Sequence, residues 1–222
     1  MVLFAFVLEQ IFHYVILNSS AGAFIQERTL LFALYGGAMA GIFEETGRFT
    51  AFGTVLKKYR HKDFNALMYG AGHGGIEALI LLGITSVNNI IYSVLINTGN
   101  TVSLISNLSG DALKQVETAI DSLITYPSYM FLLGGVERIF AVCLQLSLSV
   151  LVWFAVKNRQ QRYLYPVAVC IHLIVDAVTV IISQSVSNTA VVEVFVGAFA
   201  VVTALFAKLV WKKNTASIDP GE

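Results

Sequence analysis

The sequence has too few charged residues to cover the surface of a soluble domain. Only 13% of its 222 residues are Asp, Glu, Lys or Arg, whereas 56% are hydrophobic and the mean hydropathy is +0.73. Soluble domains carry about 25% charged residues, so the composition predicts an integral, multi-pass membrane protein. We expect an all-α, polytopic bundle of about six to eight helices in the lipid bilayer. No basic patch interleaved with aromatic residues indicates a nucleic-acid partner.

Cysteines and motifs for a covalent nucleophile are also scarce. Cys143 and Cys170 both fall in apolar runs, where small buried side chains are expected rather than a disulfide or a metal ligand. The sequence has no Gly-x-Ser-x-Gly motif and no Ser–Lys or Cys–His pair at a plausible depth, which argues against a covalent nucleophile. Met1 is followed directly by apolar residues without a basic region. The first apolar run is therefore interpreted as a span rather than a secretory signal, and the abrupt start leaves open a further span upstream.

Six apolar segments are candidates for membrane spans. They lie at about 2–17, 29–56, 63–95, 130–156, 163–183 and 191–211. The third could form one long helix or a helix followed by a bent or re-entrant one. The segment 111–124 places its apolar residues on one face, which is typical of an amphipathic helix at the membrane interface. We expect one transmembrane domain over residues 1–213 and a flexible tail over 214–222.

Three basic clusters indicate the orientation. They lie at 57–62, 157–162 and Lys212-Lys213. Cytoplasmic loops carry an excess of Lys and Arg, and six spans place all three clusters on one side. The sequence therefore predicts that both termini are cytoplasmic.

Ionisable residues interrupt three of the apolar segments. A charged group at the centre of a membrane helix costs about 2.5–3.5 kcal/mol even on lenient insertion scales. Two of the sets are pairs spaced four apart, so each pair shares a helix face. The sets are Glu44, Glu45 and Arg48 on the second segment, His73 and Glu77 on the third, and His172 and Asp176 on the fifth.

Counting from the nearest basic cluster gives similar depths for these sets. At about 1.5 Å per residue, Glu44 lies roughly 20 Å from its cluster, His73 roughly 16 Å and His172 roughly 15 Å. Glu137 comes out at about 30 Å, so Glu137 and Arg138 are interpreted as a structural ion pair at the outer edge. Three helices therefore bring ionisable groups to one layer of the membrane.

Two other features are weaker indications. Glu9 and His13 are four apart in the first segment, and one of them could help to line a cavity. The glycine-rich run at 70–75 allows either close helix packing or space for an extended substrate beside His73.

Paired carboxylates with two histidines can activate water. One Glu acts as general base, a His completes the proton path, and a second His–acid pair stabilises the oxyanion. The same residues could instead hold a divalent metal such as zinc, which lowers the pKa of bound water. Two other hypotheses stay open: a transporter or ion pathway, although no clear inverted repeat supports it, and a non-catalytic scaffold.

These motifs resemble a known family. The order Glu44-Glu45-x-x-Arg48, a His on a following span, and His172-x-x-x-Asp176 is similar to the CPBP intramembrane proteases, which include the type II CAAX prenyl endopeptidases, and to the related PrsW proteases. The sequence at 41–48 and 70–78 resembles the YhfC branch most. Members of that branch are usually described as intramembrane metalloproteases. The CAAX enzymes have one more residue before the Arg, and Phe-x-x-x-His in place of His73-x-x-x-Glu77, which disfavours prenylated peptides as substrates.

The resemblance implies an intramembrane endopeptidase that cleaves a membrane protein or peptide. It implies catalytic roles for Glu44, Glu45, His73, His172 and Asp176. Arg48 and Glu77 would support them. A metal, where one is used, would be held by Glu44, His73, His172 and Asp176. The sequence leaves the substrate, the need for a metal and the oligomeric state open.

Overall fold

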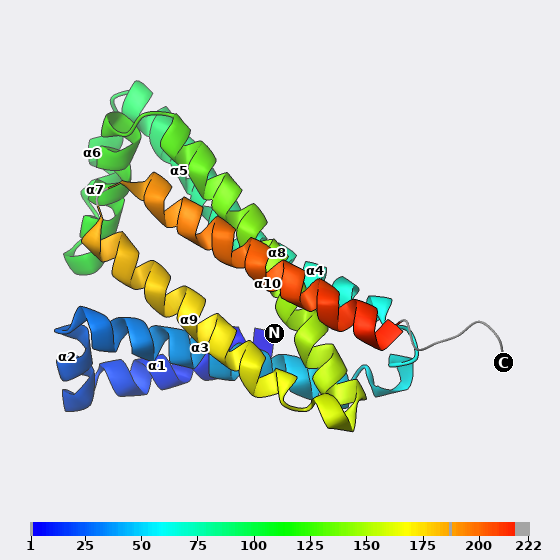
Figure 1. Ribbon diagram of the computed structural model, residues 1–222. Helices are drawn as coiled ribbons and strands as arrows, with labels where there is room; N and C mark the ends of the chain where they lie inside the picture. Colours follow the sequence, from blue (N-terminus) through cyan, green and yellow to red (C-terminus); the bar gives the residue numbers. More distant parts are fainter. Residues whose placement is uncertain (1, 187, 216–222) are drawn as a thin grey trace. The chain divides into compact units, whose positions relative to one another are not determined.

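The computed structural model describes residues 2–186 and 188–215 (Figure 1). The prediction of an all-α membrane protein is confirmed, and the described residues contain no β-strand. Short π-helical (η1, η3) and 3-10 (η2, η4) segments adjoin the α-helices. In chain order the elements are η1 (Val2–Glu9), α1 (Gln10–Leu17), α2 (Ser20–Gln26), α3 (Thr29–Gly53), η2 (Lys57–Tyr59), α4 (Phe64–Ala78), η3 (Leu79–Gly83), α5 (Ile84–Asn97), α6 (Thr101–Ile105), α7 (Gly110–Thr125), α8 (Tyr129–Lys157), η4 (Arg159–Gln161), α9 (Leu164–Ser185) and α10 (Thr189–Thr215).

Four helical runs of the described chain are long and apolar enough to cross a membrane. They are Phe64–Asn97, Tyr129–Lys157, Arg159–Ser185 and Thr189–Thr215. A fifth candidate is the pair Leu3–Leu17 and Ser20–Gln26, bent by 94°, if it forms one broken span. Helix α3 has 25 residues but carries two glutamates and an arginine. Its role as a span stays a prediction, as does the cytoplasmic position of both termini.

Several sequence-based boundaries can be compared with the helices. The segment 63–95 corresponds to one helical run, Phe64–Asn97, that includes the π-helical turn η3. The amphipathic segment 111–124 corresponds to α7, whose position at a membrane interface stays a prediction. Helix α10 continues through Thr215, and residues 216–222 of the expected tail lie outside the described residues. The expectation of two buried cysteines is wrong for Cys170, which is exposed on α9, while Cys143 is half-buried.

The chain forms two compact units, which are described separately. The first consists of Met1–Gly74 with Ile139–Glu222, and the second of Gly75–Arg138. In the second unit α5 packs against α7, with α6 between them along the chain. The single transmembrane domain expected from the sequence stays a prediction.

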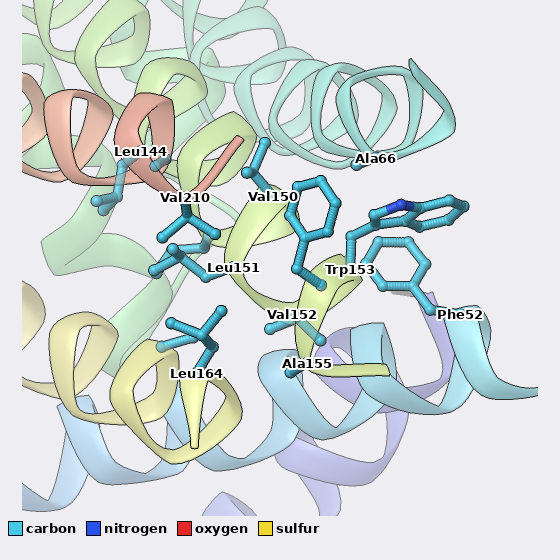
Figure 2. Close-up of a cluster of buried hydrophobic side chains, with 14 of the residues drawn as sticks. Phe52, Ala66, Leu144, Val150, Leu151, Val152, Trp153, Ala155, Leu164 and Val210 are labelled. Carbon is cyan, nitrogen blue, oxygen red and sulfur yellow. The ribbon is translucent and has the colours of Figure 1, made fainter. Parts of the chain in front are cut away.

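The hydrophobic core of the first unit is centred on the C-terminal half of α8 (Figure 2). Its residues 150–155 are all buried, because apolar side chains occupy every side of the helix there. Trp153 packs edge-on against Phe52 of α3, with ring centroids 5.1 Å apart. Its indole N–H donates a hydrogen bond to Asp63 Oδ1 at 2.8 Å. This core joins α3, α4, α8, α9 and α10.

Glycines on α3 allow it to pack closely along α9, its most extensive neighbour in this unit (Figure 1). A Cβ atom added at Gly37 would lie 2.5 Å from the carbonyl oxygen of Leu173, and one at Gly41 would lie 2.8 Å from that of Val169. No side chain fits at these distances. The two backbones therefore approach each other as small residues permit in membrane helices.

The glycine-rich run of α4 is used mainly for packing. A Cβ atom at Gly70 would lie 2.7 Å from Leu146 Cα of α8, and one at Gly74 would lie 3.0 Å from Val142 Cα. Gly72 faces open space. Of the two interpretations of this run, close helix packing therefore applies to Gly70 and Gly74.

Candidate active site

The first unit brings six of the predicted site residues together. They come from three helices: Glu44, Glu45 and Arg48 from α3, His73 from α4, and His172 and Asp176 from α9. On α3, Glu45 continues the four-residue spacing of Gly37 and Gly41, so it lies on the face that packs against α9. The four-residue spacing therefore places Gly37, Gly41 and Glu45 on the same face of α3.

Glu45 and Arg48 form a completely buried ion pair. Both side chains are 0% exposed, and Arg48 Nη1 donates to Glu45 Oε1 at 2.9 Å and to Oε2 at 2.8 Å. Glu45 Oε1 also accepts a hydrogen bond from His172 Nδ1 at 2.8 Å. Because both of its oxygens are engaged away from solvent, Glu45 is poorly placed to take a proton from water.

Arg48 connects α3 to two more helices through its second terminal nitrogen. Nη2 donates to Gln145 Oε1 of α8 at 2.5 Å and to His73 Nδ1 of α4 at 3.2 Å. The planar guanidinium can direct donors to several acceptors at once, which an ammonium cannot do with the same geometry. Arg48 thus sets the positions of Glu45, His73 and Gln145.

Glu44 is the carboxylate of the pair that reaches the edge of the site. Its side chain is 13% exposed, and Asp176 beside it is 37% exposed. Glu44 Oε2 lies 3.0 Å from His73 Nε2, and it accepts a hydrogen bond from Gln145 Nε2 at 3.1 Å. Glu44 Oε1 makes no hydrogen bond within the described part of the chain, so this oxygen is available to a water molecule.

The partners of the two histidines indicate where their ring protons lie. His73 Nδ1 faces Arg48, which can only donate, so Nδ1 accepts and the ring proton lies on Nε2, directed to Glu44. His172 Nδ1 faces Glu45, an acceptor, so Nδ1 carries a proton. His172 Nε2 then points towards Asp176 Oδ2 at 3.5 Å and Glu44 Oε2 at 3.9 Å. One histidine therefore donates to Glu44, whereas the other presents Nε2 between two carboxylates.

Gln145 is a site residue that the sequence reasoning missed. It is 4% exposed and bridges Arg48 and Glu44 with its two amide atoms. The available signal was a single glutamine in the apolar run of α8. A lone polar residue has no spacing partner on its own helix, so periodicity could not assign it to the site.

Glu9 also belongs to the surroundings of the site. It is buried at 7% exposure and interacts electrostatically with Glu44, His172 and Asp176. His13 lies behind it, with Nε2 3.2 Å from Glu9 Oε1. A cavity-lining role for one of these two residues was a weak indication from the sequence and stays a prediction.

The remaining predicted residues lie in the second unit. Glu77 is one turn after His73 on α4, and Arg138 Nη1 donates to its Oε1 at 3.4 Å. Arg138 also pairs with Glu137, so the ion pair expected there is present. A supporting role of Glu77 stays a prediction.

The fold and the site together define a polytopic membrane protein with an acid–histidine centre buried among its helices. The family model described as "YhfC intramembrane metalloprotease" matches residues 1–196, and the chain belongs to this family. It is 36% identical over 175 residues to a protein of Bacillus subtilis (strain 168) called "Uncharacterized membrane protein YhfC". The match covers 78% of this chain and 66% of that relative, so the chain spans slightly less than two thirds of the relative's length. No solved structure matches the chain.

Proposed function

We propose that the protein is an intramembrane endopeptidase in which Glu44 activates the attacking water. The observation that carries this proposal is the asymmetry of the two acids. Glu45 is fully buried and both of its oxygens bond to Arg48. Glu44 lies at the partly exposed edge of the site, and one of its oxygens has no hydrogen bond within the described residues. The family description supports a membrane protease.

Each neighbour of Glu44 has a defined role in this proposal. His73 Nε2–H and the Gln145 amide hold Glu44 Oε2, so that Oε1 takes the proton of the water as general base. In this mechanism His172 is doubly protonated: Glu45 holds its Nδ1–H, and its Nε2–H, beside the carboxylates of Asp176 and Glu44, stabilises the oxyanion that forms on the scissile carbonyl. Asp176 supports His172 electrostatically from its other side. Arg48 acts only through Glu45, His73 and Gln145.

The residue types of this centre also fit a divalent metal, and Glu44 and His73 are among the side chains whose ligand atoms lie within 4.8 Å of one another. His172 has the arrangement of a metal-binding histidine, with Nδ1 bonded to a carboxylate and Nε2 available. Glu44 and Asp176 supply hard carboxylate oxygens close to this nitrogen. His73 would join them through Nε2, which lies 3.0 Å from Glu44 Oε2, once that nitrogen has given up its proton. A metal such as zinc held by these carboxylates and histidines would lower the pKa of a water molecule.

We propose a peptide bond of a membrane-embedded or juxtamembrane protein as the substrate. This proposal rests on the depth of the site and on His73-x-x-x-Glu77, which resembles the PrsW pattern more than that of the CAAX enzymes. A prenylated peptide is correspondingly disfavoured.

The test uses reconstituted protein and a panel of membrane peptides. We expect Glu44→Gln and His172→Ala each to abolish cleavage, whereas Glu27→Gln, the same change at an exposed position, leaves it unchanged. Cleavage that persists in both site variants would refute the assignment. pH-dependent ion flux in liposomes, without cleavage of any peptide, would instead favour a transporter.

Metal analysis separates the two forms of the mechanism. If a metal takes part, purified wild-type protein contains about one equivalent and loses cleavage with a chelator, and His172→Ala loses the metal. If water is activated directly, chelator has no effect. His73→Ala should reduce cleavage in either case.

A further inference from the structure

A groove separate from the candidate active site lies between α4, α8 and α10 of the first unit. Its volume is about 310 Å³. None of the acids or histidines described above lines it. The groove therefore needs an explanation of its own.

The walls of the groove are apolar along most of its length. Ala204 and Ala207 of α10 and Val150 of α8 line the groove, and the small side chains of the two alanines leave space in it. The hydroxyl of Ser147 in the wall donates to the carbonyl oxygen of Cys143 at 2.7 Å, so it offers no donor to a ligand. Such a surface suits a hydrocarbon chain.

One part of the lining is polar and carries a positive charge. Lys208 and Trp211 line the groove three residues apart on α10, so they lie on the same helix face. Neither the Lys208 ammonium nor the Trp211 indole N–H forms a hydrogen bond or ion pair within the described residues. Lys208 lies one turn further into the helix than Lys212, about 6 Å deeper. A charge at this position is unfavourable in hydrocarbon without an anionic partner.

We propose that this groove binds an anionic phospholipid. One acyl chain lies along the apolar wall, and the phosphate is bound by the Lys208 ammonium and the Trp211 indole N–H. Basic positions beside an apolar groove between membrane helices have the charge and shape that recognise anionic head groups. Indole rings likewise combine an apolar body with a single donor. A second copy of an apolar helix would fill the groove but would leave Lys208 without a counter-charge.

The test measures lipid retention on protein purified from nanodiscs of phosphatidylglycerol and phosphatidylcholine, by native mass spectrometry. We expect wild-type protein to retain one phosphatidylglycerol in preference to phosphatidylcholine. Lys208→Gln should weaken this retention about tenfold, because one charge-assisted hydrogen bond is lost. Lys208→Arg should restore it. Lys212→Gln makes the same charge change one turn away, outside the groove lining, and should change retention less than twofold.

A second variant tests the position of the acyl chain. Ala204→Leu fills the groove without changing the charge, and we expect it to lower retention of both lipids. Equal losses for Lys208→Gln and Lys212→Gln would show diffuse attraction to the membrane and overturn the proposal. Full retention in Ala204→Leu, or a bound second copy in place of lipid, would also overturn it. The readout does not depend on proteolysis, so its outcome is independent of the proposed function.

Discussion

Replacing Arg48 tests whether the buried charge network holds the helices of the site in place. Arg48→Met removes the cation and leaves Glu45 buried without it. Removing one partner of a buried ion pair costs about 3–5 kcal/mol. Arg48 makes two hydrogen bonds to Glu45, one to His73 and one to Gln145. We therefore expect a loss of stability at the upper end of this range.

Arg48→Lys separates charge from geometry. The ammonium keeps the positive charge but cannot reproduce the planar fork that reaches Glu45 and Gln145 together. We expect the loss of about one hydrogen bond to a charged group, roughly 1.5–3 kcal/mol. The double variant Glu45→Gln with Arg48→Met should be more stable than Arg48→Met alone, because no unpaired buried charge remains.

Thermal unfolding in detergent measures these effects and is followed by the fluorescence of the two tryptophans, of which Trp153 is fully buried. For a chain of this size 1 kcal/mol corresponds to about 2–4 °C in Tm, so a loss near 5 kcal/mol in Arg48→Met should lower Tm by roughly 10–20 °C. Arg28 is the matched control, since its pair with Glu27 is exposed at 3.9 Å, and Arg28→Met should change stability by about 0–1 kcal/mol. Equal shifts for Arg48→Met and Arg28→Met would refute the reasoning.

Two further predictions concern packing and positioning. Gly41→Ala places a Cβ atom 2.8 Å from the Val169 carbonyl oxygen, so α3 and α9 must separate, and we expect both a lower Tm and weaker cleavage. Gly36→Ala faces open space and should be neutral or stabilising by up to about 1 kcal/mol; the same loss in both variants would contradict the packing argument. Gln145→Met removes two hydrogen bonds to charged groups and should lower kcat at least tenfold with a smaller effect on KM. Ser149→Ala, one turn further on α8, removes a buried hydroxyl without a hydrogen-bond partner and should not reduce stability. Unchanged kcat in Gln145→Met would exclude a positioning role.

The convergence of the polar sets could be predicted because the rise of a helix is constant. Counting residues from the basic clusters placed Glu44, His73 and His172 in one layer, and the first unit contains all three in one centre. The ion pair of Glu137 and Arg138 was predicted from their opposite charges at adjacent positions, and it is present. These predictions needed only sequence positions and an assumed helix.

The rotation of each helix could not be predicted in this way. Neighbouring residues point about 100° apart on a helix, so the sequence could not say which of Glu44 and Glu45 faces the buried arginine. The same ambiguity left Cys170 assigned to the interior, although it is exposed on α9. It also hid Gln145 of α8, which bonds to Glu44 and Arg48 of α3.

By itself, the sequence determined the membrane class, the helical fold and the family, because hydropathy and motif spacing are local properties. It also predicted that ionisable residues of three helices lie together. Tertiary structure alone decided their roles, since close packing at Gly37 and Gly41 fixes how α3 is turned towards α9. That rotation buries Glu45 between Arg48 and His172, and it leaves Glu44 at the open edge of the site.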